Sequence, residues 1–174
     1  MRNLLAMTLL ASVASLSSCA SQAAPKPVGA PILSPEQAAE VRHALVEWFE
    51  CEECTEGQLD RVVKFGQLVV PSLGATLREG PPPASIEELR QHLLANYRNL
   101  AEYQSTHPDE PVKLPMGEAE YVKTYLDNYV ALYQVRAATA LGTIGGPAAR
   151  EALLSARPVR SDVRSAVEQA LAKL

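Results

Sequence analysis

Apolar residues recur every three or four positions along most of this chain, which is the spacing of one face of an α-helix. In the segment that follows Ser34, for example, Val41, Leu45 and Trp48 fall on one such face. The pattern predicts seven helices, at residues 35–50, 56–66, 69–77, 86–104, 117–143, 147–155 and 162–173. No segment requires a strand, so the predicted fold class is all-α.

Three of these helices are predicted to begin with a capping box, in which a Ser or Thr is followed three residues later by Gln or Glu. The three pairs are Ser34 with Gln37, Thr55 with Gln58, and Ser85 with Glu88. Hydrophobic residues make up 47% of the chain but aromatic residues only 5%, so the apolar mass is mainly Ala, Leu and Val. That mixture favours closely packed helices over a β-sandwich.

The last third of the chain contains two similar helix openings, each of which runs into an Ala-Leu pair. The openings are Val135-Arg136-Ala137-Ala138 and Val163-Arg164-Ser165-Ala166, and the pairs are Ala140-Leu141 and Ala170-Leu171. This arrangement resembles the HEAT-like helical repeat of the small bacterial kind named after the phycobilisome lyases. The resemblance covers about the last 40 residues, and residues 59–77 more loosely. It implies a short stack of helical hairpins, an alpha solenoid.

The amino terminus has the features of a bacterial export signal. Arg2 is followed by an apolar run of about 13 residues, shorter than the roughly 20 that a membrane-spanning helix needs. The run ends in Leu16-Ser17-Ser18-Cys19, which resembles the bacterial lipobox. This resemblance implies cleavage after residue 18 and acylation of Cys19, which would anchor the chain in membrane lipid. Ala20 in the next position is, in lipoproteins of double-membraned bacteria, associated with the outer membrane.

The chain is therefore divided into three predicted parts. Residues 1–18 form a lipoprotein signal peptide, residues 19–34 a lipidated Cys with a flexible Pro- and Ala-containing tether, and residues 35–174 an all-α HEAT-like repeat domain. The predicted location is the cell envelope, with the lipid anchor in the outer membrane and the domain facing the periplasm.

The charge of the predicted mature chain argues against nucleic acid as a partner. Removing residues 1–18 takes away only Arg2 and leaves 15 basic and 20 acidic residues, a formal charge of −5. Binding to nucleic acid relies on basic surface. The acids concentrate in residues 36–60, with eight acids against Arg42 alone, whereas Arg and Lys outnumber acids from residue 134 onward. A charge dipole along the molecule is expected.

Cys51 and Cys54 form a CxxC, which is the one group with candidate reactivity. Three interpretations are open: a thiol-disulfide redox centre, a zinc site, or a structural disulfide. A redox centre resembling thioredoxin needs a preceding strand, and zinc needs two further ligands, for which the His residues lack paired spacing. An exported location favours the disulfide. Its geometry requires the helix that ends near residue 50 to break before Thr55.

Four tyrosines recur at every fourth position of the longest predicted helix, namely Tyr121, Tyr125, Tyr129 and Tyr133. Successive members turn by only about 40° around the helix axis, so they form one slanting stripe. Tyr121 and Tyr125 lie nearest the Pro-containing loop at residues 105–115 and are expected to be the more exposed pair. They are the candidate partner-binding residues, because Tyr offers a large contact area. The alternative is that the rings fill a helix pairing while the hydroxyls reach its solvent-exposed rim.

No nucleotide-binding, hydrolase or metalloprotease motif occurs in the sequence, so neither an enzymatic activity nor a cofactor or metal is expected. The predicted function is that of a lipid-anchored envelope protein that binds or scaffolds an unidentified envelope protein through its helical surface. The alternative function is that of a thiol-disulfide or metal-binding envelope protein that uses Cys51 and Cys54.

Overall fold

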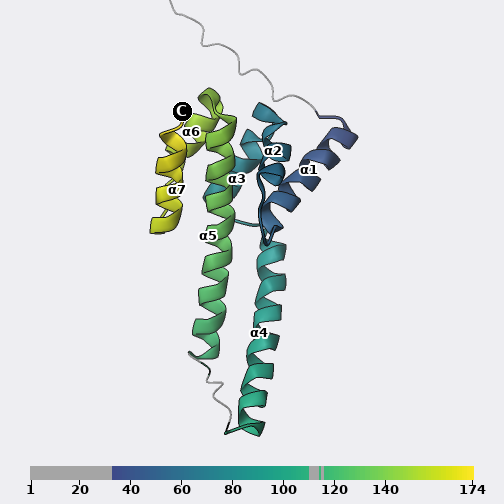
Figure 1. Cartoon of the computed structure of the whole chain (residues 1–174), viewed down its shortest axis with the longest axis vertical. Helices are drawn as coiled ribbons and strands as arrows, with labels where there is room; N and C mark the ends of the chain where they lie inside the picture. The colour runs from purple at the N-terminus through teal and green to yellow at the C-terminus, as the bar shows by residue number, and fades with distance from the viewer. Residues whose placement is uncertain (1–32, 110–113, 115) are drawn as a thin grey trace, which may run out of the picture. The chain divides into compact units, whose positions relative to one another are not determined.

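The computed structural model of the chain describes residues 33–109, 114 and 116–174. These residues form an all-α domain that contains no strand, as the sequence predicts (Figure 1). Its elements are α1 (Pro35–Glu50), α2 (Glu56–Val63), a 3₁₀ turn η1 (Gly66–Leu68), α3 (Val70–Glu79), α4 (Pro83–Thr106), α5 (Glu118–Ile144), α6 (Gly146–Ser155) and α7 (Ser161–Leu171).

Two of the three predicted capping boxes form. At the start of α1, the backbone N–H of Gln37 donates to Ser34 Oγ at 3.2 Å, and the N–H of Ser34 donates to Gln37 Oε1 at 3.0 Å. At the start of α2, the backbone N–H of Thr55 donates to Gln58 Oε1 at 2.7 Å. The box predicted at Ser85 is wrong, because α4 already begins at Pro83. A Pro at the first helical position has a suitable φ and no N–H to satisfy.

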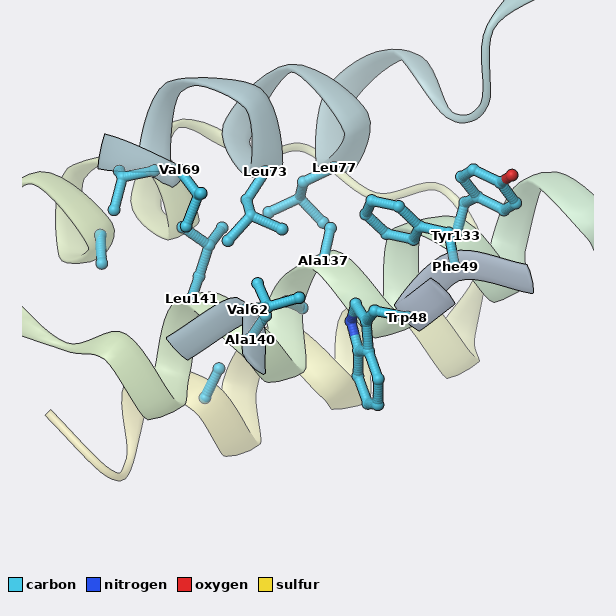
Figure 2. Close-up of a cluster of buried hydrophobic side chains, with 14 of the residues drawn as sticks. Trp48, Phe49, Val62, Val69, Leu73, Leu77, Tyr133, Ala137, Ala140 and Leu141 are labelled. Atoms are coloured by element: carbon cyan, nitrogen blue, oxygen red, sulfur yellow. The ribbon is translucent and has the colours of Figure 1, made fainter. Parts of the chain in front are cut away.

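The main core surrounds the second half of α5. Figure 2 shows Leu73 and Leu77 of α3 directed toward Ala137 and Leu141 of α5, and all four side chains are buried. α3, α6 and α7 all pack against α5, and α1 and α2 contact it as well. The Ala residues on α5 leave space for these neighbours, which is why one helix can serve as the centre of the core.

α7 approaches α5 so closely that only glycine fits at the contact. A Cβ built on Gly142 of α5 would lie 2.7 Å from the Cβ of Ala170 and 2.8 Å from its Cα. Both residues are buried. The close approach therefore depends on the missing side chain at residue 142.

A second, smaller core joins α4 to the first half of α5. Leu93 of α4 is buried against Val122 and Leu126 of α5, with Ile86, Leu89, Leu94 and Tyr121 packed around them. In Figure 1 the two helices run side by side and extend away from the remaining helices. α5 is thus shared: its first half forms a hairpin with α4, and its second half lies in the main core.

Candidate functional site

The four tyrosines of α5 form a nearly continuous series of ring contacts. The rings of Tyr121 and Tyr125 have centroids 4.6 Å apart, and those of Tyr129 and Tyr133 are 5.0 Å apart. Tyr97 of α4 extends the series, because its ring lies 5.4 Å from that of Tyr121. The stripe that the sequence predicts therefore exists on one side of α5 and continues onto α4.

Exposure changes along this stripe. Tyr125 is the exposed member, with 48% of its surface accessible, whereas Tyr133 is only 5% exposed. Tyr121 is half-buried, because its ring contacts Tyr97 and packs on the small core of the hairpin. The pair of exposed rings expected from the sequence is therefore one exposed ring, Tyr125, supported by one half-buried ring.

The inner end of the stripe holds the carboxyl end of α1. The hydroxyl of Tyr129 donates to Glu50 Oε1 at 2.8 Å, and the hydroxyl of Tyr133 donates to the same carboxylate oxygen. Burial raises the pKa of Tyr133 strongly, and the hydrogen bond to Glu50 raises it further. Burial also raises the pKa of Tyr129. Both tyrosines therefore act here as neutral donors that bind α1 to α5.

A cleft opens beside this contact, between α4 and the end of α1. Its volume is about 450 Å³, and it is lined by Glu50, Ser85, Glu88, Leu89, His92 and Tyr129. Tyr125 lies one helical turn before Tyr129 on α5, about 6 Å along the axis, and is not one of the residues that line the cleft. We call the cleft and the rings of Tyr121 and Tyr125 the tyrosine cleft.

The CxxC lies at the break between α1 and α2. Cys51 has an extended backbone with ψ 133°, and α2 starts only after Thr55, so the helix break that a disulfide requires is present. The structure joins Cys51 and Cys54 by a disulfide with a Cα–Cα distance of 5.3 Å. The loop that it closes contains Glu52 and Glu53, and all residues from 52 to 57 are exposed.

Arg136 of α5 binds the backbone at the break between α1 and α2. Its guanidinium donates to the backbone oxygens of Phe49 at 2.5 Å and Cys51 at 2.8 Å, and its own carbonyl accepts from Trp48 Nε1 at 3.1 Å. Burial lowers the pKa of Arg136. In the sequence, Arg136 is part of a repeated helix opening. The carbonyl oxygens that it binds are more than 80 positions away, and nothing in the local pattern indicates them.

The surroundings of the CxxC fit a structural bond better than a reactive thiol. Cys51 is half-buried and Cys54 is exposed, Glu52 and Glu53 lie between them, and Glu56 begins α2. A reactive cysteine is a thiolate, which positive neighbours stabilise and carboxylates disfavour. Among the described residues, no three His, Cys, Asp or Glu side chains are grouped closely enough to hold a metal ion.

Cys19, the predicted signal peptide and most of the predicted tether lie outside the described residues. None of the helices in the described part of the chain combines the length and the apolar character that crossing a membrane would need.

Comparisons with protein-family models, with curated proteins and with solved structures found no match to this chain. The class of protein is therefore defined by the described geometry: an all-α domain with a cleft between α4 and the end of α1, lined by Tyr129 of α5, and a disulfide at the break between α1 and α2.

Proposed function

We propose that this chain is a lipid-anchored protein of the bacterial cell envelope that binds a partner protein at the tyrosine cleft. The anchor is Cys19, acylated after removal of residues 1–18, and the tether of residues 19–34 separates the α-helical domain from the outer membrane. The domain faces the periplasm. The observation that carries the binding function is Tyr125, a ring that is 48% exposed and yet held in place by a neighbouring ring.

The sequence around Cys19 supports the anchor. An apolar run of signal-peptide length leads directly into Leu16-Ser17-Ser18-Cys19. Each CH₂ of an acyl chain that enters a bilayer contributes about 0.8 kcal/mol, so more than one chain on the same Cys gives stable anchoring. The export that this signal implies also agrees with a disulfide between Cys51 and Cys54.

The packing order of the helices supports the HEAT-like stack. α2 lies against α5 and α5 against α7, while α3 lies against α6. In a stack of hairpins, each repeat packs on the repeats next to it in sequence. The first helix of one hairpin then packs on the first helix of the next hairpin, and the second helix on the second helix. α5 and α6, followed by α7, fit this order, whereas α3 packs more on α5 than α2 does and has little contact with α2. α4 and the first half of α5 would then be an insertion that carries the tyrosine cleft away from the stack.

The chemistry of the tyrosine cleft suits a protein segment as its ligand. Tyr has few rotatable bonds, so an exposed ring gives a large contact area at a low entropic cost. Tyr125 is further restrained by Tyr121. The cleft beside it offers the carboxylates of Glu50 and Glu88 and the imidazole of His92. A partner segment with an apolar side chain next to a Lys or Arg would use both the rings and the carboxylates.

Photo-crosslinking in cells tests this function. The full-length chain carries p-benzoylphenylalanine in place of Tyr125, and a second version carries it in place of Leu154, a 60% exposed residue of α6. We expect an envelope protein to be captured from position 125 and not from position 154. That protein is then purified, and its affinity for the full-length chain is measured.

The measured affinity should depend on the rings of the cleft. Tyr125→Ser is expected to weaken binding at least about tenfold, as for truncation of an interface hot spot, with an unfolding midpoint close to that of the parent chain. Tyr103→Ser is the matched control, because Tyr103 is also exposed and lies near the far end of α4. Equal effects of the two substitutions on affinity would refute binding at the tyrosine cleft.

A further inference from the structure

A second open surface lies on another side of α5 and has the opposite charge. It is a groove of about 540 Å³ between the end of α3, the middle of α5 and the loop that joins α6 to α7. Leu77 and Val130 line it, together with Arg78, Arg157, Arg160 and Val159. We call it the arginine groove. Neither the proposed anchor nor the tyrosine cleft uses it.

The positive charge of the arginine groove is not neutralised from within. Arg78 and Arg157 make no hydrogen bond or ion pair to any residue that the structure describes. Arg160 is held by Asp162, with Nη2 2.7 Å from Oδ2, and so is fixed in place. The carboxylate in the lining belongs to Asp127, and Lys123 Nζ lies 2.5 Å from it. Two guanidiniums are thus left for an external anion.

The groove also presents apolar surface next to these guanidiniums. Val159 is 91% exposed at its edge, and the half-buried Val130 lies among its lining residues. A guanidinium binds a carboxylate through two parallel N–H donors, so Arg is suited to Asp and Glu side chains. The arrangement therefore fits an acidic protein segment that brings apolar atoms beside its carboxylates.

The same chain carries such a segment. Residues 52–57 are all exposed and include Glu52, Glu53 and Glu56, with the sulfur of Cys54 between them. The disulfide and the hydrogen bond from Arg136 to the carbonyl oxygen of Cys51 restrain residues 51–54, and Glu56 and Gly57 belong to the first turn of α2. A preorganised loop loses little conformational entropy when it binds.

We propose that the arginine groove of one copy binds the acidic loop of residues 52–57 of a second copy. On α5, the groove residue Val130 lies about 120° around the helix axis from Arg136, which binds the end of α1 next to the acidic loop. One molecule can therefore present both surfaces at once. The contact joins two different surfaces, so it continues from copy to copy and forms either a closed ring or an open chain.

The small size of the loop makes this contact weak between free molecules. Copies held on one membrane share a high local concentration, which compensates for a weak contact. Because the contact relies on exposed charges, it is expected to weaken between about 0.05 and 0.5 M salt, as the screening length shortens.

The test uses two differently tagged copies of the full-length chain in membranes of a bacterial host. One copy carries p-benzoylphenylalanine in place of Val159. We expect a crosslink between the two tags, and mass spectrometry should locate it in the peptide that contains Glu52 and Glu53. Arg157→Glu in the first copy should lower the yield about tenfold, and so should Glu53→Arg in the second copy.

The decisive experiment combines the two charge reversals. A carboxylate introduced at position 157 of one copy then faces a guanidinium introduced at position 53 of the other copy. The yield should recover when both are present. Arg150→Glu and Glu40→Arg are matched controls, since both residues are exposed on helices outside the groove and the loop, and neither should change the yield. Crosslinks that map to another protein, or a yield that no charge reversal changes, would overturn the proposal.

Discussion

The contact between Gly142 and Ala170 allows a direct test of how α7 packs on α5. Gly142→Ala adds one methyl group at a buried position inside a helix. The added Cβ would lie 2.7 Å from the Cβ of Ala170, and ordinary van der Waals contact begins at 3.4 Å. α7 must therefore move away by about 0.7 Å, the difference between these two distances. The Cα of Ala170, at 2.8 Å, belongs to the backbone, so no side-chain rotation can relieve the clash.

Two opposing effects set the size of the change. Replacing Gly by Ala inside a helix stabilises it by about 1 kcal/mol. Overpacking a close contact costs about 1–3 kcal/mol, and the upper part of that range applies because backbone atoms are involved. We expect a net loss of about 1–2 kcal/mol in the free energy of unfolding. For a domain of this size that corresponds to a fall of about 3–7 °C in the midpoint of thermal unfolding.

The assay is thermal and urea unfolding followed by circular dichroism at 222 nm. Gly74→Ala in α3 is the matched control, because Gly74 is also buried within a helix but its added Cβ would lie 3.3 Å from the nearest atom, the Cβ of Ala152. The control should be unchanged or more stable by up to about 1 kcal/mol. If Gly142→Ala is as stable as Gly74→Ala, the close packing of α7 on α5 is wrong, and the proposed HEAT-like stack loses its main contact.

Three further predictions concern the anchor, the thiols and the tyrosines. Cys19→Ala should abolish both the added mass of the acyl groups, measured by mass spectrometry, and the partition of the protein into detergent. A native chain recovered unacylated and soluble would contradict the proposed anchor. Denatured, unreduced protein that lacks residues 1–19 should contain no free thiol, and Cys51→Ser should release one from Cys54; thiols titratable before reduction would exclude the disulfide. Tyr129 and Tyr133 have raised pKa values in the folded chain. Above about pH 10 the unfolded chain therefore loses protons that the folded chain keeps, and the free energy of unfolding should fall as pH rises. Tyr133→Phe should make that fall shallower in urea titrations, and an unchanged slope would contradict the role of its hydroxyl.

Local sequence is enough for the helices and for most of their ends. The pattern predicts α1 at residues 35–50, where it is observed from Pro35 to Glu50, and the capping boxes at Ser34 and Thr55 both form. These features involve residues three or four positions apart, so the chain itself brings the partners together. The break between α1 and α2 around the CxxC is predictable for the same reason. The prediction at Ser85 is wrong because a competing local signal, the Pro at position 83, starts the helix one turn earlier.

The functional surfaces depend on contacts that no local pattern reveals. Arg136 binds carbonyl oxygens at residues 49 and 51, and Tyr133 binds Glu50, so each contact joins positions more than 80 residues apart. The stripe of tyrosines is visible in the sequence, but its exposure is decided by α4, whose Tyr97 covers Tyr121 and leaves Tyr125 open. The arginine groove likewise unites side chains from α3 and from the loop after α6, which only the packing of both on α5 brings together. Helical periodicity determines which face of a helix is apolar, whereas the neighbour that covers this face is chosen by the tertiary structure.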